Sequence, residues 1–350
     1  MCSLLEDCIF VGIVFSPPIF HTMNSAPSHV VSIIMPVFND WQSFMLLVEK
    51  IDAAISAANE PLSVSILAVN DGSTSEPTLL QSVFHVLPNV SSIRIIHLTR
   101  NFGHQRAIAI GLCYAAEHLP HTSAIVMDSD GEDKPEDVLT LVRASATNPG
   151  KIIFAERSKR SESLQFRFFY ALYKRVYHVL TGAPISFGNF SIIPPALLKR
   201  VSSVSEVWIH VAAGIMKARL PLAAVPTVRG VRLAGESKMN FVSLLLHGLS
   251  GIAVHSEVAA ARLLVVSLMF ILFSIVGIIT VVAIRFFTDL AIPGWATSAI
   301  GSLVAIFIEA LLMSVLLVFL VLNNRAQQPF VPRLHYDDYV ANVENVYNLL

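Results

Sequence analysis

The strongest constraint on the fold is a pair of long apolar runs near the C-terminus. Residues 263–284 form 22 consecutive positions without a charged side chain, bounded by Arg262 and Arg285. This length matches the roughly 20 residues that an α-helix needs to cross a bilayer. A second run, at about 298–322, is interrupted by Glu309 alone. The two runs predict a hairpin of transmembrane helices, and a pair of buried core helices is the alternative.

The charges that flank these runs predict how the hairpin sits in the membrane. Beyond Arg285, the connection contains no Lys or Arg, whereas Arg262, Arg325 and nearly all other positive charges lie outside the hairpin. The positive-inside rule then places both chain ends and the rest of the protein in the cytoplasm, at the inner or plasma membrane. Glu309 is costly inside lipid, which indicates a helix–helix contact, and a homo-oligomer is one way to provide it.

Composition restricts the classes of function. The 350-residue chain is 54% hydrophobic and only 14% charged, which is unusually apolar for a soluble protein. Its formal net charge of −1 gives no basic footprint for nucleic acid. Its three cysteines have neither metal-finger spacing nor an even count for a disulfide framework, so a reducing compartment fits.

Residues 30–235 alternate between strand-like and helix-like stretches. VVSIIMPVF, SVSILAVNDGS (ending in a turn), SSIRIIHLT, SAIVMDSD and KIIFAERS read as strands, and amphipathic helical patterns separate most of them. Such alternation predicts an α/β fold with a mostly parallel sheet and helices on both faces. In sheets of this kind, ligands bind outside the carboxyl ends of the strands.

The chain therefore divides into successive segments. The N-terminal extension is expected to be poorly ordered, and either Met1 or Met23 could be the true start of the protein. The segments are an N-terminal extension (1–29), an α/β domain (30–240), an interfacial amphipathic helix (241–262), two transmembrane helices (263–322) and a cytoplasmic tail (323–350).

Polar residues follow four successive predicted strands, as PVFND (36–40), VNDGS (69–73), TRNFG (99–103) and DSDGED (128–133). Each could be only a turn, because Asn, Asp, Gly and Ser are the usual turn residues. Four such ends in a row predict the rim of a polar crevice.

The last of these stretches is the most acidic. Asp128, Asp130 and Glu132 alternate, so in an extended chain their carboxylates project to one side. A hard divalent cation, Mg²⁺ or Mn²⁺, would offset their repulsion and leave positions for the oxygens of a substrate diphosphate. A solvated turn is the alternative, and we accept it for Glu136 and Asp137, which suit a helix N-terminus.

Several motifs together give a specific resemblance. They are VSIIMPVFND, LAVNDGS, LTRNFGHQRAIAIGL, VMDSDGEDKPED, GNFSII and RGVRLAGESKM, followed by the hairpin. In this order they resemble the family 2 inverting glycosyltransferases of the GT-A fold, a Rossmann-like mostly parallel sheet flanked by helices. Within that family they are similar to polyprenyl-phosphate glycosyltransferases such as dolichyl-phosphate mannose and glucose synthases.

The resemblance implies a donor site for a nucleotide sugar. The residues that match it are Pro36, Val37, Asn39, Asp40, Asp71, Gly103, Asp128, Asp130 and Arg157. Asp128 and Asp130 match the DXD motif, which implies a Mg²⁺ or Mn²⁺ cofactor, and Glu132 stands where the family usually has Gln as a third metal contact. Together with Arg229, the two aspartates are the implied catalytic residues.

The resemblance also implies a site for the acceptor phosphate, formed by Asn189, Arg229, Arg232 and Lys238. The three basic residues match a segment that receives either the acceptor phosphate or the leaving diphosphate. Arginine suits this role because it contacts phosphate through two N–H groups. For Arg232 and Lys238, contact with anionic lipid is the alternative. Related enzymes often carry Asp at the position of Asn189. An amide cannot abstract a proton, so we expect Asn189 to bind the acceptor rather than to act as a base.

The implied function is transfer of a hexose from a nucleotide sugar to a polyprenyl phosphate such as undecaprenyl phosphate, giving a lipid-linked sugar for cell-surface glycans. A UDP-sugar is favoured, with GDP-mannose next. Two alternatives stay open. One is a catalytically weakened homologue that acts as a binding or scaffold protein. The other is a processive polysaccharide synthase, although the chain lacks the Arg-Trp pair expected of one.

Overall fold

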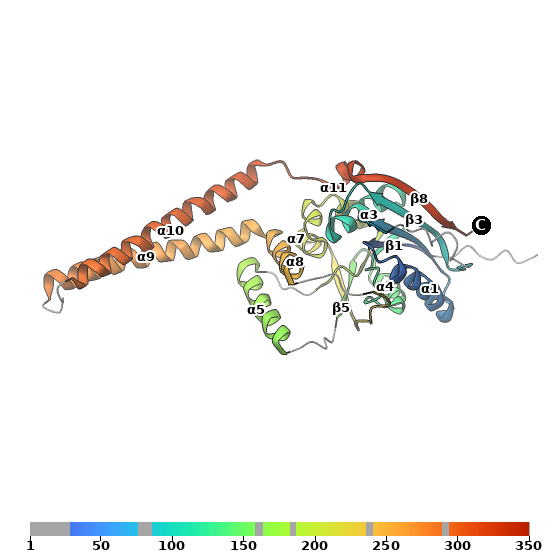
Figure 1. Ribbon diagram of the computed structural model, residues 1–350, viewed down its shortest axis with the longest axis horizontal. Helices are drawn as coiled ribbons and strands as arrows, with labels where there is room; N and C mark the ends of the chain where they lie inside the picture. The colour runs from blue at the N-terminus through green and yellow to red at the C-terminus, as the bar shows by residue number, and fades with distance from the viewer. Residues whose placement is uncertain are drawn as a thin grey trace, which may run out of the picture.

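A computed structural model describes residues 29–75, 86–157, 164–182, 187–235, 241–288 and 294–349. An α/β domain lies at one end, and a long helical hairpin projects from it (Figure 1). The expected extension at 1–29 lies outside the described residues except for His29, which begins the first strand.

One eight-stranded sheet forms the centre of the domain, in the order β7-β5-β6-β4-β1-β2-β3-β8. Only β6 and β8 run antiparallel to their neighbours. The α/β, GT-A-like prediction of a mostly parallel sheet is therefore confirmed. The strands are β1 (His29–Val37), β2 (Leu62–Asn70), β3 (Val90–Leu98), β4 (Ser123–Val126), β5 (Ile152–Arg157), β6 (Ser191–Ile193), β7 (Leu222–Thr227) and β8 (Val340–Asn348).

Helices cover both faces of the sheet because the strands are apolar on both sides. In β1, Ile33 and Met35 face one core and Ile34 faces the other, as the two-residue period of a strand requires. The first core is completed by α1 (Trp41–Ala58) and α4 (Pro135–Thr147). The second is completed by α3 (His104–His118), α6 (Pro195–Ser202), the 3₁₀ helix η1 (Ser205–Trp208) and α7 (Val211–Lys217).

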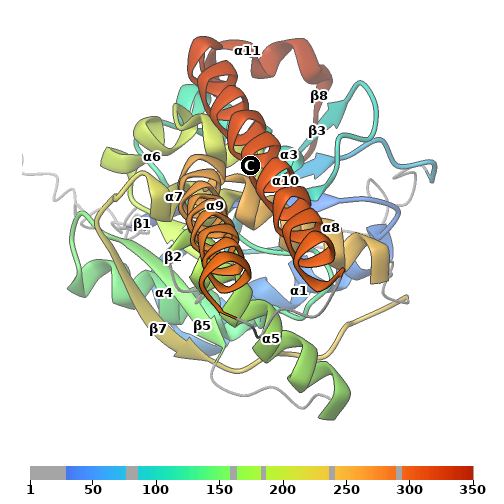
Figure 2. The same ribbon diagram turned by 90° about the vertical axis from the view of Figure 1, so that its left-hand side faces the viewer.

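The hairpin consists of α9 (Ser256–Phe287) and α10 (Trp295–Ala326), each 32 residues long. Their most apolar windows have a mean hydropathy of 2.9, and only 17% of each window is buried, so they are long and apolar enough to cross a membrane. At their interface the hydroxyl groups of Ser267 and Ser314 lie 2.7 Å apart. Figure 2 looks along the hairpin toward the domain.

The segment 241–262 is not one helix, so this prediction was wrong. It comprises α8 (Phe241–Ala253) and the first turns of α9, with a break at Val254 and His255. The carbonyl oxygen of Val254 accepts a hydrogen bond from Lys217 Nζ (2.8 Å), a tertiary contact with α7 that holds the chain at the break. Beside α8 lies α5 (Leu164–Thr181), and Tyr173 of α5 donates to the carbonyl of Gly248 (2.8 Å).

The segment after the hairpin is part of the domain. It contains α11 (Pro332–His335), the 3₁₀ helix η2 (Tyr336–Tyr339) and β8, which pairs with β3 at the edge of the sheet (Figure 1). The expected tail at 323–350 thus supplies a strand, which the sequence analysis did not foresee. It was missed because the pairing joins residues far apart in the chain.

Candidate active site

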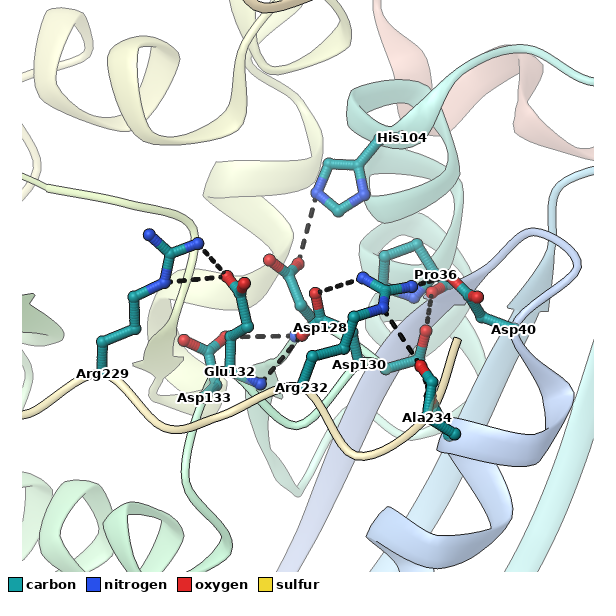
Figure 3. A network of polar contacts seen from close by, with 12 residues as sticks. Pro36, Asp40, His104, Asp128, Asp130, Glu132, Asp133, Arg229, Arg232 and Ala234 are labelled. Carbon is teal, nitrogen blue, oxygen red and sulfur yellow. Dashed lines mark hydrogen bonds and ion pairs between the residues drawn. The ribbon is translucent and has the colours of Figure 1, made fainter. Parts of the chain in front are cut away.

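The candidate site lies where β1 and β4 end, beside a loop formed by residues 228–235 (Figure 3). The acidic turn follows β4 directly. Ser129 donates to the carbonyl oxygen of Pro36 (2.9 Å), which ties this turn to the end of β1. The backbone N–H of Glu132 donates to Asp130 Oδ1 (2.9 Å). The turn is therefore fixed by its own chain and by the neighbouring strand.

Two arginines from the loop face the acidic turn. Arg232 lies between two carboxylates, with Nη2 2.7 Å from Asp40 Oδ2 and Nη1 3.0 Å from Asp130 Oδ2. Arg229 Nε donates to Glu132 Oε2 (3.0 Å). The backbone reinforces both contacts, since the N–H of Gly230 donates to the carbonyl of Glu132 (2.7 Å) and that of Leu233 to the carbonyl of Asp130 (2.9 Å). Side-chain and backbone contacts together thus hold the loop against the turn.

These arginines change the explanation of the acidic cluster. In the described residues, no three His, Cys, Asp or Glu side chains are placed to hold a metal ion together. The expected triad of Asp128, Asp130 and Glu132 is therefore not assembled, because Glu132 faces Arg229 and Asp130 faces Arg232. Asp128 and Asp130 still offer the oxygen donors that Mg²⁺ and Mn²⁺ prefer. The aspartates fit such a cation if Arg232 moves off Asp130.

Burial raises the pKa of Asp130 above its ordinary value, against the hydrogen bond from the backbone of Glu132. The negative charges of Asp128 and Glu132 raise this pKa further, and the Arg232 guanidinium opposes them. A positive group close to Asp130, whether arginine or a divalent cation, thus favours its ionised form.

His104 is a site residue that the sequence analysis missed. It begins α3, and its Nε2 lies 3.3 Å from Asp128 Oδ1 and 3.3 Å from Asn189 Nδ2. Desolvation lowers the pKa of His104, but the carboxylates of Asp128, Asp71 and Asp130 together outweigh it, so the pKa is raised overall. The available signal was its position directly after TRNFG, at the third polar strand end. The structure thus brings Asn189 and Asp128 together around one imidazole.

Asp71 and Gly103 form a structural contact at the ends of β2 and β3. The two carboxylate oxygens of Asp71 accept the backbone N–H groups of Phe102 (2.7 Å) and Gly103 (2.9 Å). Gly103 has a φ of +92°, and a Cβ there would meet nothing within 4 Å. Glycine is therefore required here by its backbone conformation.

The residues after β1 contribute in different ways. Val37 is fully buried, and its carbonyl oxygen accepts the N–H of Asp71 (2.9 Å), so it supports the end of β1 and presents no surface to a nucleotide. Asn39 has a φ of +55°, and its Oδ1 accepts the backbone N–H groups of Thr74 (2.8 Å) and Ser75 (3.1 Å). It therefore joins the polar ends of β1 and β2. Arg157 ends β5, where its backbone pairs with Thr227, and Lys238 lies outside the described residues.

The mostly parallel sheet places an acidic turn and an arginine-bearing loop together where β1 and β4 end, and comparison with known proteins defines the family. Residues 32–208, more than half of the chain, match the model of glycosyl transferase family 2. The chain belongs to this family.

Individual relatives include polyprenyl-phosphate sugar transferases, to which the chain is homologous. It is 28% identical over 294 residues to an uncharacterised glycosyltransferase, YkcC, of Bacillus subtilis, covering 81% of this chain and 86% of the relative. It is 31% identical over 150 residues to a dodecaprenyl-phosphate galacturonate synthase of Rhizobium johnstonii, covering 43% and 42%. It is 25% identical over 223 residues to an undecaprenyl-phosphate 4-deoxy-4-formamido-L-arabinose transferase of Enterobacter, covering 62% and 64%.

Among solved structures, the chain is similar to glucosyl-3-phosphoglycerate synthase of Mycobacterium tuberculosis, crystallised with Mn²⁺ and UDP. The TM-score is 0.42 at 15% identity, and the match covers 67% of this chain and 80% of that one.

Proposed function

We propose that this glycosyltransferase moves a hexose from a nucleotide sugar, preferably a UDP-sugar, to a polyprenyl phosphate such as undecaprenyl phosphate at a membrane. The observation that carries the proposal is the acidic turn after β4, which is held by ion pairs to a loop that bears Arg229 and Arg232. Polyprenyl-phosphate relatives support the choice of acceptor.

The donor would lie across the ends of β1, β2 and β4. Asp40 and Asn39 would meet the base and ribose. Asp128 and Asp130 would hold a divalent cation, which when bound offsets the negative charge of the donor diphosphate. Arg229 and Arg232 would then exchange their carboxylate partners for phosphate oxygens. Arginine can make this exchange because its planar guanidinium pairs with either anion through two N–H groups.

The acceptor needs binding more than activation. A phosphate monoester is already ionised near neutral pH, so it can attack the anomeric carbon without a strong general base. Asn189 and His104 lie next to Asp128, where an amide and an imidazole can donate hydrogen bonds to phosphate oxygens. The nucleoside diphosphate leaves toward the arginine loop as the new sugar–phosphate bond forms on the opposite face.

The hairpin explains why the acceptor should be a lipid. If α9 and α10 cross the bilayer, the domain at the base of the hairpin lies near the headgroups (Figure 1), where a polyprenyl phosphate presents its phosphate. Pairing of β3 with β8 supports placing the segments before and after the hairpin on one side of the membrane, because both strands belong to one sheet. The positive charges favour the cytoplasmic side.

The test measures release of the nucleoside diphosphate and transfer of the sugar by the full-length protein in detergent. UDP- and GDP-sugars are supplied one at a time with undecaprenyl phosphate and Mg²⁺ or Mn²⁺. We expect one donor to give a lipid-linked sugar. Asp130→Ala should lower the rate by at least about a hundredfold, since a charge-stabilising group at the reacting centre is lost.

The matched control is Glu136→Ala, which removes an exposed carboxylate from the first turn of α4 and should leave the rate unchanged. Equal rates for Asp130→Ala and wild type would refute the proposed role of the acidic turn. Binding of a nucleotide sugar without any turnover would favour the weakened homologue, for which Asn189 is the motivating residue.

A further inference from the structure

The two long helices lie together at the connected end and diverge toward the domain (Figure 1). At the end nearest the domain an open cleft lies along α9, with Arg325 contributed by α10, and its volume is about 540 Å³. Its lining combines apolar and charged side chains, namely Val258, Ala261, Val265, Glu257, Arg262 and Arg325.

The two arginines in this cleft use only part of their hydrogen-bonding capacity in the contacts described below. Arg325 Nε lies 3.8 Å from Glu257 Oε1, and the two side chains are 67% and 41% exposed. An ion pair this long and this exposed contributes little to stability. Arg262 donates through Nη1 to the carbonyl oxygens of His178 (3.2 Å) and Val179 (2.6 Å) at the end of α5. Because a guanidinium carries five N–H donors, Nε and Nη2 can serve another acceptor.

The two arginines lie at the same end of the hairpin. Arg262 immediately precedes the apolar run 263–284, and Arg325 follows the run 298–322 by a few residues. In a membrane-spanning hairpin, this end lies at the level of the lipid headgroups. This step rests on the membrane placement made under the proposed function.

We propose that the cleft binds an anionic glycerophospholipid. Arg262 and Arg325 receive its phosphodiester, and an acyl chain lies along Val258, Ala261 and Val265. Two arginines and one glutamate give the cleft a net charge of +1, which complements the single negative charge of a phosphodiester such as that of phosphatidylglycerol. The glycerol hydroxyls of that headgroup can donate to Glu257. A polyprenyl phosphate carries a monoester with up to two charges and complements this set less well.

The test uses the full-length protein in mild detergent, incubated with phosphatidylglycerol, phosphatidylcholine or undecaprenyl phosphate. Native mass spectrometry then measures the retained lipid. We expect phosphatidylglycerol to be retained in preference to the other two. Arg325→Gln should lower its retention by about tenfold, the loss expected for one charged hydrogen bond.

Two further variants test whether the loss of lipid is specific to the arginines of the cleft. Arg285→Gln removes the same charge from the opposite end of α9 and should retain phosphatidylglycerol as wild type does. Glu257→Gln keeps every arginine and should retain at least as much. The proposal is overturned if the two phospholipids are retained equally, if Arg285→Gln loses as much as Arg325→Gln, if Glu257→Gln lowers retention, or if undecaprenyl phosphate is the retained lipid.

Sugar transfer measured on the same samples separates this site from the proposed activity. Lipid retention that depends on Arg325 in a protein without transfer would leave the lipid site standing and remove the transferase proposal. Sugar transfer without selective lipid retention would support the transferase proposal and remove the lipid site.

Discussion

At the scale of single residues, the acidic turn is balanced by arginines. Arg232 and its partners Asp40 and Asp130 are all less than a fifth exposed, at 17%, 19% and 19%. The Arg229–Glu132 pair is more open, with side chains 42% and 24% exposed. A charge pair that has lost most of its water is costly to break, because the remaining charge cannot be rehydrated fully. The two arginines should therefore differ in their effect on stability.

We expect Arg232→Gln to lower the free energy of unfolding by about 1–3 kcal/mol, because two partly buried carboxylates lose their shared cation. Arg229→Gln should cost less than about 1 kcal/mol, as exposed pairs do. Chemical unfolding of each full-length variant in detergent measures the difference. Arg232→Gln should also bind Mn²⁺ more tightly in the absence of donor, seen by electron paramagnetic resonance. Equal stability losses for the two variants, together with unchanged Mn²⁺ affinity, would contradict the role of Arg232 as the shared partner of Asp40 and Asp130.

Asn189 tests how the acceptor is bound. Asn189→Ala should weaken the binding of polyprenyl phosphate by about 1–3 kcal/mol, the value of a hydrogen bond to a charged group. Asn189→Asp should raise the Michaelis constant for the lipid phosphate without raising the maximal rate, because it adds a negative charge beside Asp128. Initial rates against polyprenyl phosphate concentration, at saturating donor and fixed metal, give both constants. A several-fold higher maximal rate for Asn189→Asp would mean that a general base had been missing.

Sequence could predict which residues gather at the site but not how they pair. Asp128, Asp130 and Asn189 stand at strand ends or beside them, and the pattern of a parallel sheet brings such ends together. The arginine partners come from a loop that follows β7, and no periodicity predicts where that loop crosses. The only sequence signal for His104 was its position directly after the polar end of the third predicted strand. Its relation to Asp128 depends on how α3 begins.

At the scale of elements, the first five strands were predictable and the other three were not. β1 to β5 are apolar stretches that precede turn residues or helical patterns. β6 has three residues, β7 contains Pro226, and β8 carries Asn and Glu side chains along its length. These three depend on pairing with distant strands rather than on local pattern. The break between α8 and α9 is hidden for the same reason, because Lys217 of α7 holds it.

Tyr336 tests whether the segment after the hairpin stabilises the domain. It is 1% exposed within the core that α3 completes, and its hydroxyl donates to Glu117 (2.8 Å). We expect Tyr336→Ala to cost about 3–5 kcal/mol of stability through the cavity that it leaves. Tyr336→Phe should cost only about 1 kcal/mol, since it removes one hydrogen bond. Thermal unfolding of both variants in detergent measures this contrast, and no destabilisation by Tyr336→Ala would mean that the segment is an independent tail.

At the scale of the whole molecule, the sheet constrains the topology of the hairpin. β3 precedes α9 and α10 in the chain, β8 follows them, and the two strands are hydrogen-bonded neighbours. Reporter fusions should therefore place a site after Arg325 in the cytoplasm together with the domain, and a site in the connection between α9 and α10 on the far side. A reporter after Arg325 that is active outside the cytoplasm would overturn this topology.

The pairing of β8 with β3 also sets an order of events during synthesis. The ribosome makes β3 well before the hairpin and β8 only after it, a delay on the order of tens of seconds at typical elongation rates. Throughout that interval one edge of the nascent sheet has no partner strand, and Tyr336 has not yet filled its place in the core. An open edge is a hazard for aggregation. The domain can thus reach its complete fold only after both long apolar helices have been synthesised, so maturation of the domain comes after the chain has had the opportunity to enter the membrane.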